Sequence, residues 1–348
     1  MKIKNRLISK NSSPFIIAEI SANHENSLKK VIRIMEIIAK SGADAIKFQT
    51  YTPDEMTLNV KKKDFLIKDQ NSLWKGQNLY NLYKKGMTPG HWFKTLFKKA
   101  NELGLIAFSS PFDIKSVDLL EKLNTPVYKL ASFEIVHIPL IKKIAKTKKP
   151  MIISTGMASC KEIKEAISVA KRYGCREIAL LKCTSTYPAK LKNSNLLTIN
   201  DMKKRFRCEV GFSDHTIGLA APISAICNGA TIIEKHVTLR KNDKGLDSAF
   251  SIEARDFKNL VTQCRLAKES IGKVNYGPTK DEIKSLKYRR SIYVSGDIKR
   301  GETLTHKNIK VIRPSHGLHP RFYDKIIGRK VIKNLKMGEP FKLSFLKK

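Results

Sequence analysis

The segments Gly211-Phe-Ser-Asp-His-Thr216 and Ile232-Ile-Glu-Lys-His-Val237 are the part of the sequence from which the fold can be inferred. Each is a short apolar run that ends near an acidic residue and a histidine. Residues 218–229 between them are apolar enough to form a packed helix. A strand, a crossover helix and a second strand give two neighbouring parallel strands. The sequence therefore predicts that His215 and His236 lie at the same end of adjacent strands.

A pair of converging histidines is a candidate metal site. Two imidazoles, with oxygen atoms from Ser213, Asp214 and Glu234 close by, can hold a divalent cation and leave positions open for a substrate. Two unrelated histidines in polar loops are the alternative, because short motifs often match by chance. The choice between these interpretations depends on what the rest of the chain predicts.

Short apolar, β-branched runs alternate with amphipathic segments up to about residue 272, which is the pattern of a parallel sheet built from βα units. Eight such runs with intervening helices, spread over somewhat more than ~250 residues, predict a (β/α)8 barrel. An open doubly wound sheet is the alternative, but no G-x-G-x-x-G follows the first run. The predicted strands are residues 15–20, 44–50, 105–109, 126–131, 151–155, 177–183, 209–213 and 231–236.

In a barrel of this kind, the chemistry takes place at the carboxyl-terminal ends of the strands. Polar or ionisable residues stand at that end of all eight predicted strands. Three of them, Lys47, Lys129 and Lys182, lie inside apolar runs, where a lysine is costly to bury unless an anion meets it. With a row of hydroxyls and with Gly156 opening a loop before a helix, they predict a pocket for phosphate and carboxylate groups. For any one lysine, an ion-paired or solvated side chain is the alternative.

The chain has 348 residues, of which 67 are Lys or Arg and 31 are Asp or Glu, so its net charge is +36. Such a basic protein raises the possibility of a nucleic acid or an anionic membrane as a partner. The lysines are instead spread over predicted helix faces and short loops, with no aromatic stacking platform, zinc finger or basic arm. We therefore expect solvated surface charge and no nucleic-acid partner, and part of the charge can serve an anionic substrate.

Composition also limits the class of protein. With 41% hydrophobic residues, the chain can bury one large core and a small second one. No apolar run is long enough to span a bilayer and residues 1–13 lack the apolar stretch of a signal peptide, so we expect a cytoplasmic protein without a membrane partner. The six cysteines are scattered without C-x-x-C spacing, which indicates reduced thiols rather than disulfides or a zinc cluster.

The character of the sequence changes beyond Gly272. Residues 275–281 are turn-rich and polar, as expected of a linker, and residues 290–305 and 309–314 have the pattern of short strands joined by glycine turns. The last part of the chain has no catalytic signature of its own and is marginal in size for an independent domain. The predicted domains are a barrel over 1–274, a linker over 275–288 and a β-rich module over 289–348.

The chain contains, in order, the motifs AEISANHENS, GADAIKFQTYTPDEMT, FSSPFD, PVYKLASFEI, PMIISTGMAS, ALLKCTSTYPA, GFSDHTIG, IIEKHVTL and GLDSAFS. Together they resemble the sialic acid synthase family, whose members condense phosphoenolpyruvate with an acylamino sugar. The AEISANH form, the segment 74–83, the LLKCTS run and the turn 317–320 are most similar to the pseudaminic acid synthase branch of that family. The resemblance implies an α/β fold, a (β/α)8 TIM barrel followed by a small antifreeze-like (SAF) domain.

The resemblance also implies an activity. It would be a transferase that forms a carbon–carbon bond, breaks the C–O bond of phosphoenolpyruvate and releases phosphate. In the pseudaminic acid synthase branch the acceptor is 2,4-diacetamido-2,4,6-trideoxy-L-altrose. The alternative is an N-acetylneuraminate or legionaminate synthase, which uses the same chemistry on another acylamino sugar.

By similarity, His215 and His236 would ligate a divalent metal. Mn2+ is the expected ion, with Mg2+ or Co2+ as substitutes. The metal would act as a Lewis acid that polarises the aldehyde carbonyl of the open-chain sugar, so that C3 of phosphoenolpyruvate attacks the carbonyl carbon.

A second group of residues would, by similarity, bind the phosphate and carboxylate of phosphoenolpyruvate. The family often has threonine at the position of Ser110 and asparagine at that of Ser185, so this chain keeps a hydroxyl at the first position and loses an amide at the second. The group consists of Lys47, Ser110, Lys129, Ser132, Ser154, Ser185, Tyr187 and Ser213.

Carboxylates near the reacting centre are the third group that the resemblance implies. Glu19 and Glu134 lie where family members place such carboxylates, and either can manage the proton of the water that attacks C2 or of sugar ring opening. We favour Glu19.

Binding of the sugar is assigned to three further residues. Gln49 shares a strand face with Lys47, and Asp247 matches a position that contacts a sugar hydroxyl, although Leu246 replaces the usual proline before it. Arg313 lies where the SAF domain offers an arginine to the sugar; an arginine on a short loop is otherwise most often surface charge. Candidates for an apolar lining around the 6-deoxy end of the sugar are Phe133, Phe250 and Trp74.

The SAF domain of this family covers the barrel mouth of a partner subunit, so the resemblance implies a domain-swapped homodimer. His316 and His319 in the same domain are expected to have turn or capping roles rather than to bind a second metal. Two other classes stay open: a catalytically silent barrel that only binds ligands, and a basic nucleic-acid-binding protein.

Overall fold

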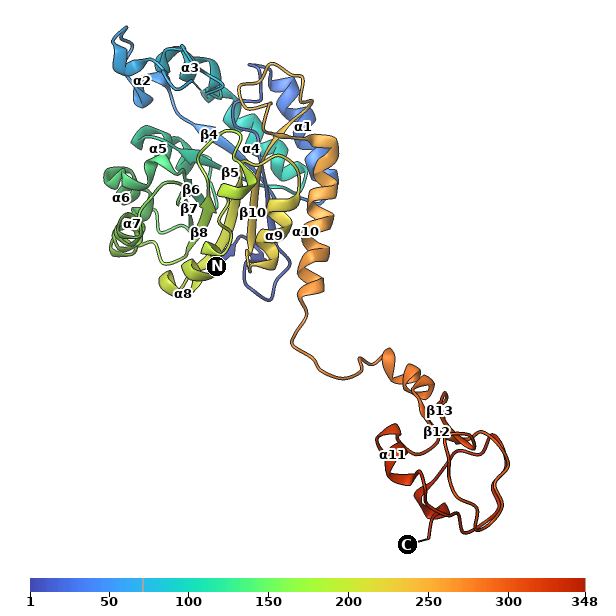
Figure 1. Cartoon of the computed structure of the whole chain (residues 1–348). Coiled ribbons are helices and arrows are strands. Elements are labelled where there is room, and N and C mark those ends of the chain that lie inside the picture. Colours follow the sequence, from blue (N-terminus) through green and yellow to red (C-terminus); the bar gives the residue numbers. More distant parts are fainter. Residues whose placement is uncertain (71, 348) are drawn as a thin grey trace. The chain divides into compact units, whose positions relative to one another are not determined.

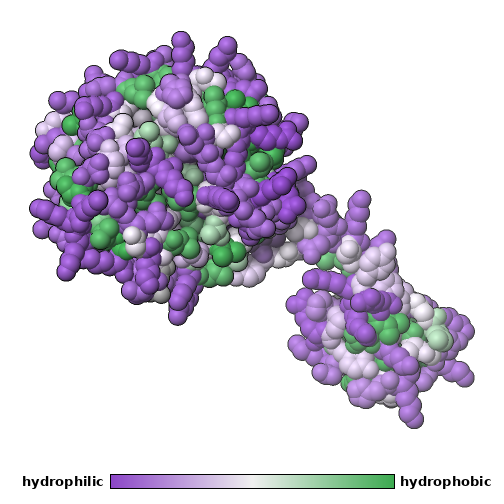
Figure 2. All heavy atoms as spheres, turned by 90° about the horizontal axis from the view of Figure 1, so that it is seen from above, coloured by the Kyte–Doolittle hydropathy of each residue, from purple (hydrophilic) through white to green (hydrophobic). Residues whose placement is uncertain are grey.

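The computed structural model describes residues 1–70 and 72–347. The chain divides into two compact units, Met1–Gly272 and Lys273–Lys348, and each unit has its own apolar core. Hydrophilic side chains cover most of the visible face of each unit, with smaller apolar areas between them (Figure 2). Among the described helices, none combines the length and the apolar character needed to cross a bilayer. The six cysteines are free thiols, in agreement with their scattered spacing.

The first unit is a closed barrel (Figure 1). Within the described residues, eight parallel strands follow one another in chain order, and the last, β10, pairs with both β9 and the first, β3. This closure confirms the predicted (β/α)8 barrel and excludes the open sheet. The barrel strands are β3 (Phe15–Glu19), β4 (Ala45–Thr50), β5 (Ile106–Pro111), β6 (Tyr128–Leu130), β7 (Met151–Ser154), β8 (Ile178–Cys183), β9 (Glu209–Asp214) and β10 (Ile232–Thr238), and β11 (Ile252–Glu253) joins the outer edge of β10.

At least one helix follows each barrel strand, and α1 (Leu28–Ser41) shows how the sequence specifies it. Ser27 caps its first turn by accepting a hydrogen bond from the backbone of Lys30, and Gly42 ends the helix in a left-handed conformation. Its apolar residues recur at helical spacing and form one buried stripe, Val31, Ile34, Met35 and Ile38. The other covering helices are α4 (Phe93–Glu102), α5 (Ile114–Lys122), α6 (Ile138–Lys146), α7 (Cys160–Arg172), α8 (Thr198–Phe206), α9 (Ala220–Cys227) and α10 (Phe257–Ile271).

The connection between β4 and β5 is longer than the others and contains two additional helices. These are α2 (Pro53–Met56) and α3 (Leu79–Gly86). Short 3-10 helices lie in this and other connections of the first unit: η1 (Lys63–Phe65), η2 (Gly90–Trp92), η3 (Phe133–Val136), η4 (Leu191–Asn193) and η5 (Ala254–Asp256).

The interior of the barrel changes from apolar to polar along the strands. Alternate residues of a strand face inward, so Ile17 and Glu19 do so on β3, and Ile232, Glu234 and His236 do so on β10. The polar members lie at the carboxyl-terminal ends of the strands, above an apolar inner layer. That layer consists of Phe15, Ile17, Ala45, Phe108, Val127, Ile152, Ala179, Leu181 and Ile232, with Ile3 and Ile8.

A short amino-terminal hairpin packs against the apolar end of the barrel interior. Its strands β1 (Lys2–Ile3) and β2 (Arg6–Leu7) are antiparallel, and Ile3 and Ile8 join the inner apolar layer. The guanidinium of Arg6 lies 2.9 Å from the carboxylate of Asp44, at the start of β4. This hairpin was not predicted, because its two-residue strands leave almost no periodic signal.

Two predicted site residues face away from the interior. Leu181 belongs to the inner layer, so Lys182 beside it points outward, where its ammonium donates to the carbonyl of Cys183 at 2.7 Å. Asp214 also points outward and is ion-paired with Lys235. The predictions that Lys182 lines the pocket and that Asp214 offers an oxygen atom to a metal between the histidines are therefore wrong, because successive residues of a strand lie on opposite faces.

The second unit is built on an antiparallel pair of strands, β12 (Ser291–Val294) and β13 (Ile309–Ile312), with α11 (Tyr323–Ile326) beside its core. The two predicted strand regions of this part of the chain each contain one of these strands. Gly317 packs so closely that a Cβ atom there would lie 2.1 Å from the carbonyl oxygen of Ile292. Its 3-10 helices are η6 (Glu282–Tyr288), η7 (Pro320–Phe322) and η8 (Leu343–Phe345).

Gly211 on β9 offers a test of the barrel packing. A Cβ atom at this position would lie 2.4 Å from the carbonyl oxygen of Ile232 and 2.7 Å from a methyl carbon of Leu181. Gly211→Ala should therefore destabilise the first unit by on the order of 2 kcal/mol or more, measured by urea unfolding. In the control Gly296→Ala, the new methyl group meets nothing within 4 Å, and we expect a much smaller effect. Equal losses in both variants would contradict the close packing at Gly211.

Candidate active site

A cavity of about 1130 Å³ opens at the carboxyl-terminal ends of the barrel strands, and its lining comes from the strand ends and the connections that follow them. Glu19, predicted as a catalytic carboxylate, is fully buried and is not part of the lining. Arg313 belongs to the second unit. The predicted residues that line the cavity are Lys47, Gln49, Ser110, Lys129, Ser132, Glu134, Ser154, Ser185, Tyr187, Ser213, His215, His236 and Asp247.

Four buried charges of alternating sign lie at the base of this cavity. The ammonium of Lys47 is 2.5 Å from the carboxylate of Glu19 and 3.7 Å from that of Glu234. The ammonium of Lys129 lies 3.7 Å from the other oxygen of Glu234. Each cation is thus partnered, which is what makes its burial tolerable. We refer to these four residues as the charge row.

The pKa values of the charge row reflect burial and these ion pairs. Burial lowers the pKa of Lys129 and raises that of Glu19. Burial also disfavours the charged forms of Lys47 and Glu234. The carboxylates of Glu19 and Glu234 outweigh this effect for Lys47 and raise its pKa above the ordinary value. The two lysines likewise lower the pKa of Glu234 to about 2. Glu234 is therefore the permanent anion of the row. The sequence had suggested it only as an oxygen donor near the histidines.

Hydroxyl groups surround the charge row. Lys129 donates to the hydroxyl of Ser154 at 2.6 Å and Lys47 to that of Ser110 at 3.2 Å. The hydroxyl of Ser213 donates to Glu234 at 2.9 Å. Ammonium and hydroxyl groups that converge in this way are suited to binding phosphate oxygens.

A second polar corner lies around Gly156, after β7. Gly156 has a φ of 38°, and a Cβ atom there would lie 2.6 Å from both the Cβ of Ser132 and the hydroxyl of Ser185. The thiol of Cys183 lies 2.9 Å from the hydroxyl of Ser132. Glycine at this position therefore lets the side chains of Ser132 and Ser185 approach the backbone of the loop closely.

The two histidines converge on one side of the cavity, with their ring centroids 5.3 Å apart. Nδ1 of His215 donates to the carbonyl of Thr184 at 2.9 Å, so Nε2 carries the free lone pair. Burial lowers the pKa of His215 to about 3, and its ring is therefore neutral at physiological pH. A neutral imidazole with an available nitrogen is the form that ligates a metal.

The chemistry of this pair fits a divalent cation with open coordination positions. Within residues 1–70 and 72–347, no group of three or more His, Cys, Asp or Glu side chains is placed to hold a metal. Asp214 faces outward, and Glu234 lies between the two lysines. The protein would therefore supply two imidazoles, and water or substrate oxygen atoms would complete the coordination.

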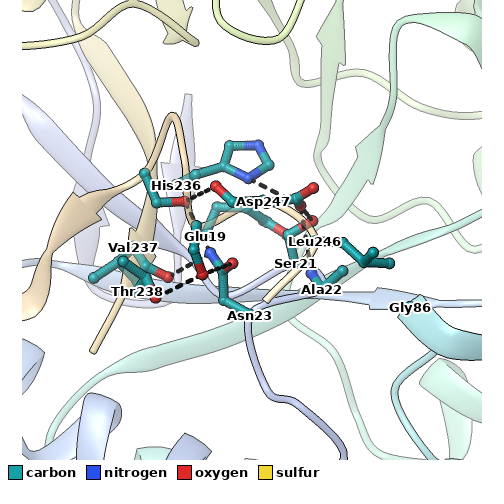
Figure 3. Close-up of polar contacts among 12 residues, drawn as sticks. Glu19, Ser21, Ala22, Asn23, Gly86, His236, Val237, Thr238, Leu246 and Asp247 are labelled. Carbon is teal, nitrogen blue, oxygen red and sulfur yellow. Dashed lines mark hydrogen bonds and ion pairs between the residues drawn. The ribbon is translucent and has the colours of Figure 1, made fainter. Parts of the chain in front are cut away.

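Asp247 lies beside the second histidine (Figure 3). Its carboxylate is 3.5 Å from Nδ1 of His236, and it accepts hydrogen bonds from the hydroxyl of Ser21 and the backbone of Ala22. Although burial alone would raise the pKa of Asp247, His236 and these hydrogen bonds hold it below its ordinary value. Asp247 is thus an ionised acceptor that faces the cavity.

Residues of the turn after β3 hold Asp247 in place, and this role was not predicted from the sequence. Ser21 has a φ of 48°, which residues other than glycine rarely adopt. The amide of Asn23 donates to the carbonyl of Val237 and to the hydroxyl of Ser251. Figure 3 shows how these contacts join the turn after β3 to the end of β10 and the segment that follows.

Glu134 lines a different part of the cavity, on η3. Burial raises its pKa to about 7, and its Oε2 has no hydrogen-bond partner among the described residues. The proximity of Glu134 also contributes to a raised pKa of Tyr83 on α3, after the larger effect of burial. A carboxyl group that titrates near neutral pH in a cavity is suited to general acid–base catalysis.

The aromatic candidates are divided by the structure. Trp74 and Phe133 line the cavity, as expected of an apolar sugar-binding end. Phe250 is buried behind the histidines, with its ring centroid 5.1 Å from that of His236. The suggestion that Phe250 lines the cavity is therefore wrong, because its ring supports the histidine pair instead. In the second unit, His319 has the expected capping role and accepts from the backbone of Arg321 at 3.1 Å.

The fold and the site define a class of barrel enzymes in which buried lysines, hydroxyls and two histidines meet at the carboxyl-terminal face, with a small β module after the barrel. The sequence model of the NeuB family matches residues 34–276, and that of the SAF domain matches residues 289–347. The chain belongs to the NeuB family. This confirms the resemblance to sialic acid synthases that its motifs suggested.

Individual relatives agree with this assignment. Pseudaminic acid synthase of Helicobacter pylori is 45% identical over 331 residues, which cover 94% of this chain and 96% of that protein. Pseudaminic acid synthase of Campylobacter jejuni is 42% identical over 328 residues, 94% of this chain and 95% of that protein. A solved structure of N-acetylneuraminic acid synthetase from Leptospira borgpetersenii superposes with a TM-score of 0.73 at 29% identity, and covers 82% of this chain and 94% of that one.

The raised pKa of Glu134 predicts a pH-dependent cost to stability. The folded state keeps this carboxyl protonated up to about pH 7, whereas the unfolded chain ionises it near its ordinary value of 4.5. Stability is therefore lost as the pH rises through this interval. Relative to the wild type, Glu134→Gln should gain up to roughly 3 kcal/mol at pH 8 and little at pH 4. Urea unfolding at both pH values checks this, with the exposed Glu165→Gln as control. A difference that does not change with pH would contradict the assignment.

Proposed function

We propose that the chain condenses phosphoenolpyruvate with 2,4-diacetamido-2,4,6-trideoxy-L-altrose and releases phosphate, which is the reaction of a pseudaminic acid synthase. The observation that carries this proposal is 42–45% identity to two such enzymes over 94% of the chain. The cavity supports it, because two lysines and a set of hydroxyls suit a phosphorylated carboxylic acid. We place the reaction in the cytoplasm, where phosphoenolpyruvate is produced.

Different side chains would bind the phosphate and the carboxylate of phosphoenolpyruvate. Lys47 and Lys129 would hold its phosphate, together with the hydroxyls that they already contact. Ser132 and Ser185, on either side of Gly156, would hold its carboxylate. Ser185 offers a hydroxyl where the family often has an amide. Because Gly156 has no Cβ, this hydroxyl lies close to the loop and would contact the bound carboxylate. Tyr187 and Ser213 complete this group from the neighbouring strand ends.

His215 and His236 would hold the divalent metal, Mn2+ with Mg2+ or Co2+ as alternatives, and it would supply Lewis-acid activation of the sugar aldehyde. The remaining steps depend on protein groups. Asp247 beside His236 would accept a hydrogen bond from a sugar hydroxyl and so orient the acceptor. Gln49 lines the same cavity and would contact the sugar from β4.

The two candidate carboxylates, Glu19 and Glu134, would take part in different proton transfers. Glu19 lies against Lys47, on the side proposed for phosphoenolpyruvate, and would accept the proton of the water that attacks C2. Glu134 lies on the side of Tyr83 and the sugar, and with a pKa of about 7 it would exchange the proton required for sugar ring opening. In this scheme C3 of phosphoenolpyruvate bonds to the aldehyde carbon, and the aldehyde oxygen gains a proton. Water adds to C2 and gives a proton to Glu19, and collapse of the tetrahedral intermediate to a 2-keto group breaks the C–O bond and releases phosphate.

An apolar wall beside Asp247 suits the deoxy sugar. A Cβ atom on Gly86 would lie 3.1 Å from the hydroxyl of Tyr51, 3.2 Å from a methyl carbon of Leu246 and 3.3 Å from the Cβ of Ala22, so these side chains meet at one point. All of them line the cavity. Trp74, in the β4–β5 connection, donates from its indole N–H to the carbonyl of Leu246 at 3.3 Å and so holds this wall in place. A methyl group of the acceptor, rather than a hydroxymethyl group, is suited to such a surface.

The SAF domain would act on the site of a second subunit. We propose a domain-swapped homodimer in which Arg313 of one subunit reaches the sugar bound in the barrel of the other. Arg313 lies directly after β13 and precedes a cis peptide bond to Pro314. The two parts that this arrangement requires, a barrel and an SAF domain, are both matched in this chain.

Phosphate release tests the proposed reaction. With phosphoenolpyruvate and Mn2+, release is expected with the diacetamido altrose and not with N-acetylmannosamine. Removal of the metal with EDTA should abolish release, and added Mn2+ should restore it. Preferential release with N-acetylmannosamine would assign neuraminate synthesis, and preferential release with the corresponding legionaminate precursor would assign legionaminate synthesis. Release with none of these sugars would favour a barrel that binds ligands without turnover.

Gly86→Ala tests the apolar wall. The added methyl group would displace Leu246 or α3 and so alter the wall. We therefore expect kcat/KM for the sugar to fall about tenfold or more, while KM for phosphoenolpyruvate stays unchanged. Gly90→Ala lies on the same connection and meets nothing within 4 Å, which makes it a matched control. Unchanged sugar kinetics in Gly86→Ala would exclude this wall from the sugar site.

A further inference from the structure

A buried ion pair lies on the outer face of the barrel, directly behind the two histidines. Asp214 and Lys235 are partners in the β9–β10 ladder, their charged groups are 2.5 Å apart, and they are 1% and 2% exposed. Each immediately precedes one of the histidines in the chain. The mechanism proposed above uses neither of them.

The pair also holds the backbone of Thr216. The ammonium of Lys235 donates to the carbonyl of Thr216 at 2.7 Å, and the backbone N–H of Thr216 donates to the carboxylate of Asp214 at 2.8 Å. Both backbone polar groups of this residue are thus bound by the ion pair. We call this arrangement the Asp214–Lys235 clamp.

The clamp stands where the strand ladder ends. The last paired residues of β9 and β10 are Asp214 and Lys235, so no ladder hydrogen bond from β10 reaches His215 or Thr216. On the other side, the carbonyl of His215 accepts from the backbone of Ala189 at 2.9 Å. The clamp therefore replaces the missing ladder on the β10 side and fixes the segment that carries His215.

Stability alone does not account for a charged pair in this position. Its surroundings are the apolar layer between barrel and helices, which includes Phe212, Ile233 and Val237. In such an environment, apolar side chains of similar volume are often as stable as an ion pair or more stable. What apolar side chains cannot do is bind the N–H and the carbonyl of Thr216.

We propose that Asp214 and Lys235 are positioning residues for His215. They hold the backbone after β9 in the position that brings the imidazole of His215 close to that of His236. This inference rests on the proposed metal site. The clamp acts through Thr216, and loosening it lets His215 leave its place without unfolding the barrel. Partners that orient a metal-binding histidine affect metal affinity by about 10- to 100-fold.

Two double variants of the full chain separate positioning from folding. Asp214→Leu with Lys235→Met removes the polar contacts and keeps an apolar pair of similar size. Asp214→Asn with Lys235→Gln removes the charges but keeps an acceptor for the N–H of Thr216 and a donor for its carbonyl. Mn2+ binding is measured without substrates, from the paramagnetic resonance signal of free Mn2+, and thermal unfolding is measured in parallel.

We expect the apolar pair to keep the unfolding temperature of the wild type, or exceed it, and to bind Mn2+ at least tenfold more weakly. The amide pair should bind Mn2+ within about threefold of the wild type. Unchanged Mn2+ affinity in the apolar pair would overturn the proposal, and so would its failure to fold, which would assign the clamp to stability. Equal losses in both variants would also overturn it, because they would assign the effect to charge and not to the contacts with Thr216. A wild-type chain that binds no Mn2+ would overturn the proposed metal site and, with it, this inference.

Discussion

The pairing of four buried charges is the constraint on which the rest of the barrel depends. Glu19, Lys47, Glu234 and Lys129 come from β3, β4, β10 and β6, so they meet only when the barrel closes. A lysine left alone in this interior would be strongly destabilising. Closure of the sheet and assembly of the site are therefore one event. The ion pairs that offset the cost of burying the two lysines also place their ammonium groups at the base of the cavity.

The charge row also prepares the site for an anion. Its two lysines are balanced by two carboxylates, so the charge row itself carries no net charge. A bound dianion would add negative charge beside Glu19, whose pKa burial has already raised, and would so favour proton transfer from the attacking water to this carboxylate. Glu234 keeps its charge throughout, because the two lysines lower its pKa to about 2.

Much of this architecture could be predicted from the sequence. The eight strands were found because apolar β-branched runs alternate with helical periodicity, and lysines inside such runs pointed to an anion site. The faces of Lys182 and Asp214 were predicted wrongly, because parallel barrel strands are apolar on both sides and their pattern does not show which residues point inward. The apolar wall was not predicted, because Gly86 and Leu246 are far apart in the sequence and meet only in the fold. The hairpin around Ile3 was missed because its two-residue strands are too short to show an alternating pattern.

The origin of the side chains in the cavity has a consequence for evolution. The charge row comes from the strands, whereas Leu246, Trp74 and Gly86 belong to the connections after β10 and β4. Replacing or lengthening a connection costs a barrel little stability. With the sugar site that we propose, a new acceptor sugar would require changes in two loops only and would leave the charge row unchanged. Enzymes for different nine-carbon acids could then diverge without passing through an inactive ancestor.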